Sequence, residues 1–285
     1  MLDRGLESLL RARAEGYAIA AFTTYTLEST RAICTAGERT GLPVVICAGA
    51  SSYRWVGREQ LASSSIAAAE AASTPVGVHL DHSRDLGEIR ACIELGYSSV
   101  MFDGSSLPYE ENVSLTKALA DMAHASGVWV EAELGGIGGE EDASTDAVPF
   151  ELTDPEQARD FVARAGVDAL APAVGTVHGF TRRPVSVDIA RVRAIAEATG
   201  VPLVLHGGSG LSAGVLAQLI DAGIAKVNIN AQLRRSYIDA LRHGARRGGD
   251  DVAALQMEAI EAMTEAATAL VLALRPRTDV QWGTQ

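Results

Sequence analysis

Short runs of apolar residues alternate with longer segments of helical periodicity along nearly the whole chain. The apolar runs are rich in Val, Ile, Leu and Ala, as expected of strands that are buried on both faces. The predicted strands lie near Ala18–Phe22, Pro43–Ala48, Val76–Leu80, Ser98–Phe102, Trp129–Glu133, Ala169–Ala173, Pro202–His206 and Lys226–Asn230. The predicted helices lie near Leu27–Thr40, Arg58–Ala72, Leu86–Leu95, Tyr109–Ser126, Pro155–Ala165, Asp188–Thr199 and Ala213–Ala222, with an eighth that begins about Ala231.

Eight strand–helix units in succession predict an α/β fold, namely a closed (β/α)8 TIM barrel. The alternative is a doubly wound open sheet, in which the polar strand ends gather at one crevice. Here polar residues follow many of the strands, so the barrel is favoured. The apolar-periodic segment from Asp250 to Leu274 predicts an extra C-terminal helix. No low-complexity linker interrupts the pattern, so residues 1–285 are expected to form a single domain.

The composition narrows the class of protein. Hydrophobic residues make up 47% of the chain and aromatic residues only 5%, so a core of Ala, Val, Leu and Ile is expected. The formal net charge of −12 argues against a general surface for nucleic acid or membrane. Cys34, Cys47 and Cys92 are widely spaced in apolar segments, which is typical of reduced thiols in a cytoplasmic protein. The N-terminal MLDRGLESLLRARAEG predicts an amphipathic helix with acidic residues rather than a signal peptide, and no segment approaches membrane-spanning length.

Three histidines follow predicted strands that end at one rim of such a barrel. In Pro75–Asp85 (PVGVHLDHSRD), an apolar run ends in Asp81 and His82, which are costly to bury unless water, a metal or a substrate meets them. His178 closes a glycine loop after the sixth strand, and His206 ends the seventh. Three imidazoles with an open fourth position are the ligand set of a catalytic zinc, so a zinc site is predicted. A hydrogen-bonded structural role is the alternative for any one of them.

Two acidic residues and two loops add candidates around this rim. Asp103 and Glu133 also end strands and are candidates for an alternate metal position or for support of the metal ligands, with hydrogen bonding to rim backbone as the alternative. The turn Gly207–Gly210 precedes a helix, where backbone amides favour a phosphate, although tight strand-to-helix geometry also explains it. The long, glycine-rich, acidic loop Leu134–Leu152 predicts a functional lid, with a solvated acidic run as the alternative.

Six motifs occur in order along nearly the whole chain and are highly specific in combination. They are VHLDHSRDL, SVMFDGSSLPYEEN, VEAELGGIGGEED, VGTVHG, LVLHGGSGL and KVNINAQL. On these motifs the chain resembles the class II, metal-dependent ketose-bisphosphate aldolases, most of all their tagatose-bisphosphate branch. The resemblance implies a homodimer or homotetramer that acts on a small sugar phosphate, with no nucleic-acid or membrane partner. It also implies one catalytic Zn²⁺ per subunit and a monovalent cation, Na⁺ or K⁺, near the phosphate.

The resemblance also implies roles for particular residues. Zinc ligation is implied for His82, His178 and His206. Asp81 matches the acid that carries a proton to and from the aldehyde-derived oxygen. Within GGEED, Glu141 matches the mobile loop acid that deprotonates the donor in some relatives. The residues at positions that contact dihydroxyacetone phosphate are Gly179, Gly207, Gly208, Ser209, Asn228, Asn230 and Ala231.

The chain departs from the family pattern where the substrate is recognised. The usual Asn-x-x-Thr-(Asp/Glu) after the eighth strand is here Asn228-Ile229-Asn230-Ala231-Gln232, so a phosphate-binding hydroxyl and an acid are missing. Phe22-Thr23 replaces Phe-Asn after the first strand, and the usual Tyr after His178-Gly179 is absent. Arg182 and Arg183, a few residues further on, are candidates for the lost phosphate contacts, with solvated surface arginines as the alternative.

The resemblance thus implies an aldehyde-lyase that reversibly cleaves a ketose (bis)phosphate into dihydroxyacetone phosphate and an aldehyde through a zinc-stabilised enediolate. Because of Ala231 and Gln232, an aldolase with a different donor or acceptor sugar is the first alternative. A metal-dependent hydrolase usually has a His-x-His pair on the first strand, and Ala18–Thr24 contains no histidine. A metal-binding barrel without catalysis is the last alternative, and the presence of Asp81 and Glu141 argues against it.

Overall fold

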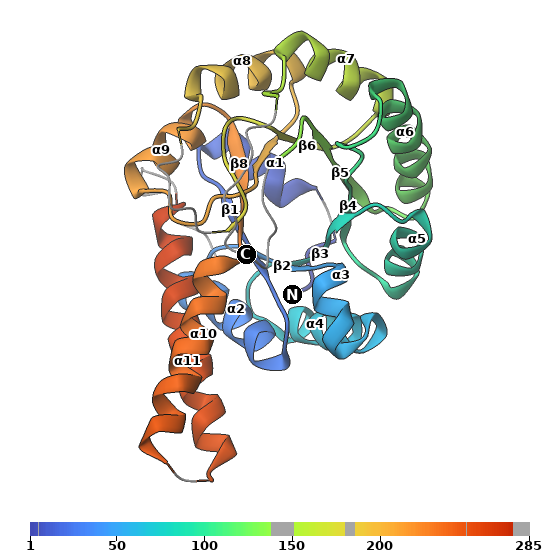
Figure 1. Cartoon of the computed structure of the whole chain (residues 1–285). Helices are drawn as coiled ribbons and strands as arrows, with labels where there is room; N and C mark the ends of the chain where they lie inside the picture. Colours follow the sequence, from blue (N-terminus) through green and yellow to red (C-terminus); the bar gives the residue numbers. More distant parts are fainter. Residues whose placement is uncertain (5, 138–150, 180–185, 249, 276–285) are drawn as a thin grey trace.

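Eight parallel strands close into one barrel in the computed structural model, which describes residues 1–4, 6–137, 151–179, 186–248 and 250–275 (Figure 1). The strands are β1 (Ile19–Thr23), β2 (Val44–Ala48), β3 (Val76–Ser83), β4 (Ser99–Phe102), β5 (Trp129–Leu134), β6 (Ala169–Pro172), β7 (Leu203–Leu205) and β8 (Ile224–Ile229). Each strand pairs with its neighbour in sequence, and β8 pairs with β1. This closure confirms the predicted TIM barrel and excludes the open, doubly wound sheet.

Helices surround the barrel (Figure 1). They are α1 (Glu7–Glu15), α2 (Leu27–Thr40), α3 (Ala50–Val56), α4 (Arg58–Ala71), α5 (Leu86–Leu95), α6 (Tyr109–Ala125), α7 (Pro155–Ala165), α8 (Ile189–Thr199), α9 (Ala213–Asp221), α10 (Ala231–Arg247) and α11 (Val252–Ala273). All the predicted helices are present, but α3 is absent from the prediction. Gly49 and Gly57 bound this seven-residue helix, so its sequence looks like a loop. Gly49 is required because a Cβ there would lie 2.4 Å from the backbone oxygen of Asp81.

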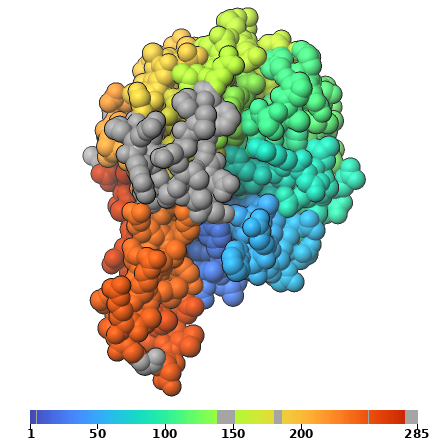
Figure 2. All heavy atoms as spheres, in the orientation of Figure 1, coloured from blue at the N-terminus to red at the C-terminus, as the bar shows by residue number. Residues whose placement is uncertain are grey.

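The predicted C-terminal helix is α11, which forms an antiparallel pair with α10. Figure 2 shows the end of this pair standing out from the barrel. The barrel-side part of α11 lies against α2, where Arg39 and Glu261 form an exposed ion pair at 2.9 Å. Within the described ranges, no helix is long and apolar enough to span a bilayer.

The barrel encloses a core of its own, separate from the layer between strands and helices. Its side chains range in size from Ala171 to Trp129, and Leu9 and Ala12 of α1 belong to it. The three cysteines are buried and free, as predicted. Three ionisable residues also lie in the barrel interior and are at most 1% exposed, namely His79 of β3, Glu131 of β5 and Lys226 of β8. The interior below the C-terminal rim is therefore partly ionic.

Candidate active site

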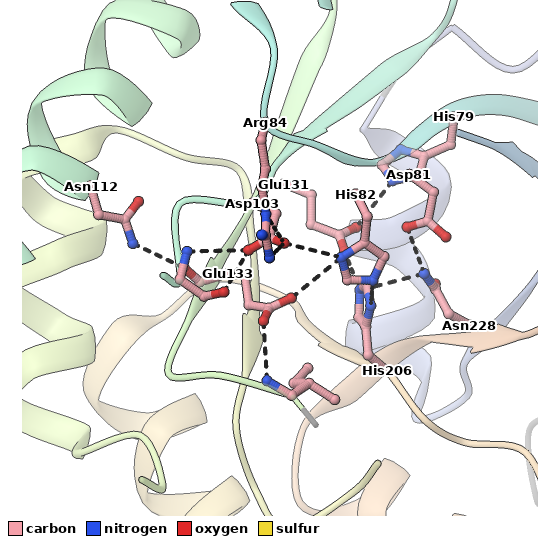
Figure 3. Close-up of polar contacts among 12 residues, drawn as sticks. His79, Asp81, His82, Arg84, Asp103, Asn112, Glu131, Glu133, His206 and Asn228 are labelled. Carbon is pink, nitrogen blue, oxygen red and sulfur yellow. Dashed lines mark hydrogen bonds and ion pairs between the residues drawn. The ribbon is translucent and has the colours of Figure 1, made fainter. Parts of the chain in front are cut away.

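The last residues of β3 depart from a regular strand. The pairing between β3 and β4 shifts between Leu80 and Ser83, and His82 has a φ of 47°, the only positive value at a non-glycine residue in the described ranges. Neighbouring residues of a regular strand point to opposite faces. Here Asp81 and His82 both contact residues of the barrel rim (Figure 3). A non-glycine residue in this region of φ costs about 1–3 kcal/mol, which is typical of constrained functional sites.

Three imidazoles, from β3 and from the segments after β6 and β7, meet at this rim. His206 Nδ1 lies 2.7 Å from His82 Nε2, and the ring centroids of His82 and His178 are 4.9 Å apart. One nitrogen of each ring lies within 4.8 Å of the others, a spacing that suits a single ion. Burial lowers the pKa of His178 and of His206, which favours the neutral rings that bind metals. The structure thus brings the three predicted ligands together.

A second group of potential ligands shares His82. Asp103, after β4, and Glu133, in β5, have carboxylate oxygens 3.8 and 3.6 Å from His82 Nδ1. Arg84 donates two hydrogen bonds to Asp103 Oδ2, at 3.0 and 2.7 Å. Burial raises the pKa of Glu133 to about 8, and a bound cation would instead favour its carboxylate form. One ligand atom from each of the three also lies within 4.8 Å of the others, so the group is suited to an alternate metal position.

The two carboxylate oxygens of Asp81 differ in their hydrogen bonding. Asn228 Nδ2 donates to Asp81 Oδ1 at 3.0 Å, whereas Oδ2 is buried and has no hydrogen-bond partner in the described part of the chain. Burial raises the pKa of Asp81, but the neighbouring His82 and His206 outweigh it, and the pKa lies below its ordinary value. An oriented carboxylate beside three imidazoles is a group able to exchange a proton with a bound molecule.

The turn after β7 packs against the loop that carries the third histidine. Gly207 has a φ of 66°, and a Cβ there would lie 2.3 Å from the carbonyl oxygen of Val177. A Cβ on Gly208 would lie 2.6 Å from Val227 Cγ1. Close approach therefore requires glycine at both positions, and the positive φ requires it again at the first. Tight packing therefore explains the glycines at these two positions, and the same turn also has the form predicted for an anion-binding site.

The other predicted substrate contacts lie on the same rim. Ser209 lies in the glycine turn before α9, and Gly179, which follows His178, has a φ of 77°. Asn230 Nδ2 donates to the hydroxyl of Tyr25 at 2.7 Å, and Ala231 is buried in the first turn of α10. The predicted residues that fall outside the described part of the chain are Glu141, Arg182 and Arg183.

A buried ionic network lies behind the histidines and is absent from the sequence prediction. Glu131 accepts hydrogen bonds from His206 Nε2 at 2.8 Å and from Lys226 Nζ at 2.7 Å. His79 Nε2 lies 3.7 Å from the same carboxylate, and its Nδ1 is 2.8 Å from Ser99 Oγ. Burial, followed by the charge of Lys226, lowers the pKa of His79 to about 3. The signal in the sequence is a charge inside each of two apolar strands, which is costly unless the charges are paired.

A pocket of about 620 Å³ lies beside this rim, between α2, α3, α10 and α11. Its lining is largely apolar and includes Trp55 and Leu233, with Arg54 and Arg234 as cations. Tyr25, the partner of the Asn230 side chain, also lines it, whereas none of the three histidines does. The pocket therefore lies beside Asn230, at the end of β8, and does not contain the histidine cluster.

Comparison with known proteins agrees with this geometry. The sequence model of the class II fructose-bisphosphate aldolases matches residues 3–275. The chain is 38% identical over 236 residues to the D-tagatose-1,6-bisphosphate aldolase subunit GatY of Klebsiella oxytoca, covering 82% of this chain and 83% of that protein. The crystal structure of the YdjI aldolase of Escherichia coli K12 is similar with a TM-score of 0.86 at 32% identity, over 97% of this chain and 98% of that one. The crystal structure of a Coccidioides immitis protein, named a putative fructose-1,6-bisphosphate aldolase, is similar with a TM-score of 0.88 at 34% identity, over 95% of this chain and 96% of that one. The chain therefore belongs to the class II fructose-bisphosphate aldolase family, and it is an aldolase, a carbon–carbon lyase built on a TIM barrel.

Proposed function

We propose that this protein is a zinc-dependent aldolase that reversibly cleaves a ketose bisphosphate into dihydroxyacetone phosphate and an aldehyde. The observation that carries the proposal is the convergence of His82, His178 and His206 beside the buried carboxylate of Asp81. Three neutral imidazoles fit Zn²⁺ and leave room for a substrate oxygen. When bound, zinc acts as a Lewis acid for the negative charge that the donor half acquires as an enediolate.

Asp81 is proposed to carry the proton of the substrate hydroxyl at C4. In cleavage, Oδ2 accepts that proton while the electrons of the C3–C4 bond pass to the donor half and the C4 hydroxyl becomes the aldehyde carbonyl. In synthesis the same proton returns to the aldehyde oxygen. The hydrogen bond from Asn228 supports this role because it fixes the carboxylate and leaves Oδ2 available. Glu141 is proposed, from the family resemblance, to exchange the proton on the donor carbon.

The donor phosphate is proposed to bind at the rim between β6, β7 and β8. Backbone amides of a glycine turn before a helix favour an anion, and the turn before α9 has this form. A monovalent cation, Na⁺ or K⁺, is proposed beside the phosphate. The proposed contacts are Gly179, Gly207, Gly208, Ser209, Asn228 and Asn230.

We also propose that the protein acts as a homodimer or homotetramer in the cytoplasm. Large apolar side chains are exposed on neighbouring helices, with Leu27 63% and Trp55 81% exposed, which supports contact with another copy. The Klebsiella relative is itself named a subunit. Free, buried cysteines fit a reducing compartment. Light scattering on the protein as it elutes from a size-exclusion column would measure its molar mass and therefore the number of subunits.

An aldolase with a different donor or acceptor is the second candidate, and the start of α10 favours it. Ala231 is 2% exposed and offers no hydroxyl where relatives have a threonine. The Oε1 atom of Gln232 is buried and has no hydrogen-bond partner among the described residues. An unsatisfied buried oxygen is costly, so a donor group of the substrate is expected to meet it.

Deuterium exchange into dihydroxyacetone phosphate, followed by NMR, tests the proposal without a guess about the acceptor. Zinc-loaded protein is compared with chelator-stripped protein, and zinc is then restored. Exchange that requires zinc is expected, because the donor must lose a carbon-bound proton to form the enediolate. No exchange by protein that holds one zinc would reject dihydroxyacetone phosphate as the donor. The same assay on unphosphorylated donors then tests the second candidate.

A further inference from the structure

The buried pair of Glu131 and Lys226 lies in the barrel interior. Glu131 lies next to His206, one of the three histidines (Figure 3). Glu131 is 0% exposed and Lys226 is 1% exposed. Neither residue belongs to the ligand set or to the proton transfer described above. We propose that Glu131, anchored by Lys226, is a positioning residue that holds His206 in the tautomer and orientation needed to bind zinc. This inference rests on the proposed function, because it presumes that the three histidines bind zinc.

The position of one hydrogen atom follows from the contact between Glu131 and His206. An ionised carboxylate only accepts hydrogen bonds, so the hydrogen in the 2.8 Å contact lies on His206 Nε2. Lys226 Nζ lies 2.7 Å from the other oxygen of Glu131, and this buried positive charge favours the ionised carboxylate.

A neutral imidazole with its hydrogen on Nε2 presents a lone pair at Nδ1. His206 is 0% exposed, and burial disfavours a charged imidazolium ring. Its Nδ1 is the atom that lies 2.7 Å from His82 Nε2, inside the cluster. The acceptor on one side of the ring therefore directs a lone pair toward the cluster on the other side. In the metal-free protein, this short contact then takes its hydrogen from His82.

Lys226 gives the carboxylate its second partner. The two oxygens of Glu131 are used separately, Oε1 by His206 and Oε2 by Lys226. The acid comes from β5, the lysine from β8 and the histidine from the end of β7, so three strands fix one hydrogen bond. Lys226 also neutralises a carboxylate that would otherwise be a buried, uncompensated charge. The pair thus forms a fixed acceptor of zero net charge.

A purely structural ion pair is the competing explanation, and it makes a different prediction. Replacing a buried ion pair with apolar residues of similar volume is often neutral or stabilising for the fold. The double variant Glu131→Leu/Lys226→Met removes both charges together and leaves no acceptor for His206. If the pair is structural only, this variant binds zinc as the original protein does. If Glu131 positions His206, the variant folds but binds zinc more weakly.

The experiment measures zinc affinity by competition with a chromophoric chelator, and thermal unfolding of the metal-free proteins by circular dichroism. The Leu/Met variant is expected to unfold cooperatively and to bind zinc about 10- to 100-fold more weakly, the usual effect of losing a partner of a metal ligand. The Gln/Met variant, Glu131→Gln/Lys226→Met, keeps an oxygen acceptor and is expected to recover part of the loss. A zinc affinity of the Leu/Met variant within about twofold of the original protein would overturn the inference.

Ser99→Ala provides the matched control. It removes the partner of His79 in the same network, 2.8 Å from Nδ1, and leaves the bond between Glu131 and His206 in place. Its zinc affinity is expected to equal that of the original protein. An equal loss in Ser99→Ala and in the Leu/Met variant would show that zinc affinity reports general disturbance of the core, which would also overturn the inference.

A second measurement needs no folded variant of the pair. The ¹⁵N spectrum of histidine-labelled, metal-free protein reports which nitrogen of each ring carries hydrogen, and His206→Gln identifies the signals of His206. A protonated Nε2 and a bare Nδ1 are expected, and the opposite tautomer would overturn the inference. If the original protein binds no zinc, the proposed function fails while this spectrum still tests the tautomer. If zinc binds and the Leu/Met variant keeps its affinity, the positioning role alone fails.

Discussion

Replacing Gly207 with alanine tests how tightly two of the histidine-bearing segments are packed. The added Cβ would lie 2.3 Å from the carbonyl oxygen of Val177, whereas real Cβ contacts stay above 3.0 Å. The turn or Val177 must therefore move by about 0.7 Å, the difference between 3.0 and 2.3 Å. Because His178 is the next residue and His206 precedes the glycine, the movement is expected to separate two of the three imidazoles.

Gly207→Ala is destabilised both by the positive φ and by the steric overlap of the new methyl group. A substitution at Gly200 measures the cost of the positive φ alone. Alanine in the left-handed region costs about 1–2 kcal/mol, and forcing an extra methyl group into packed surroundings costs about 1–3 kcal/mol. Gly207→Ala is therefore expected to lose about 2–5 kcal/mol of unfolding free energy. Gly200, after α8, has a φ of 71° with no atom within 4 Å of an added Cβ. Gly200→Ala is therefore expected to lose only the free energy that alanine costs in the left-handed region.

Urea unfolding of the metal-free proteins measures the difference between the two variants, and chelator competition measures zinc affinity. Gly207→Ala is expected to be about 1–3 kcal/mol less stable than Gly200→Ala and to bind zinc about tenfold more weakly or worse. Gly200→Ala is expected to keep the original zinc affinity. Equal stabilities and equal zinc affinities in the two variants would refute the close packing of the two segments.

Three further outcomes are expected. Asp81→Asn should keep full zinc and deuterium exchange into the donor while cleaving the C–C bond about 10²-fold more slowly or worse; an unchanged cleavage rate in a coupled assay would remove Asp81 from proton transfer. His206→Ala should lose zinc and activity together, by metal analysis after dialysis, and full activity would contradict the ligand assignment. Glu261→Gln removes the charge of Glu261 from the exposed pair with Arg39 and should leave the urea midpoint of unfolding unchanged, because solvent screens the pair; a clear fall in the midpoint would show that α11 depends on that pair.

The barrel and its rim could be predicted because periodicity and strand-end polarity are local properties of the sequence. Eight apolar runs separated by helical segments have few alternatives to a closed parallel barrel. Once that fold is assumed, the C-terminal ends of the strands must meet, so Asp81, His178 and His206 are brought together by topology alone. The structure shows this meeting directly in His178 and His206, whose ring centroids are 5.8 Å apart.

Other features depend on contacts between strands that are far apart in sequence. Glu131 and Lys226 are separated by 95 residues, and each alone looks like a charge misplaced in an apolar run. The φ of 47° at His82 has no signal in its own residue type, because it results from the shifted pairing between β3 and β4. Helix α3 is short and bounded by glycines, and one of these, Gly49, is required because the backbone of Asp81 leaves no room for a side chain.

The ionic interior of the barrel limits how this protein can be engineered or diversified. A search for thermostable variants would select apolar replacements of Glu131 and Lys226, since filling a barrel with hydrophobic side chains often raises the melting temperature. If the carboxylate positions His206, such variants would gain heat resistance and lose the metal. Screens for stable variants of this protein should therefore measure bound zinc as well as melting temperature, and should leave Glu131 and Lys226 unchanged.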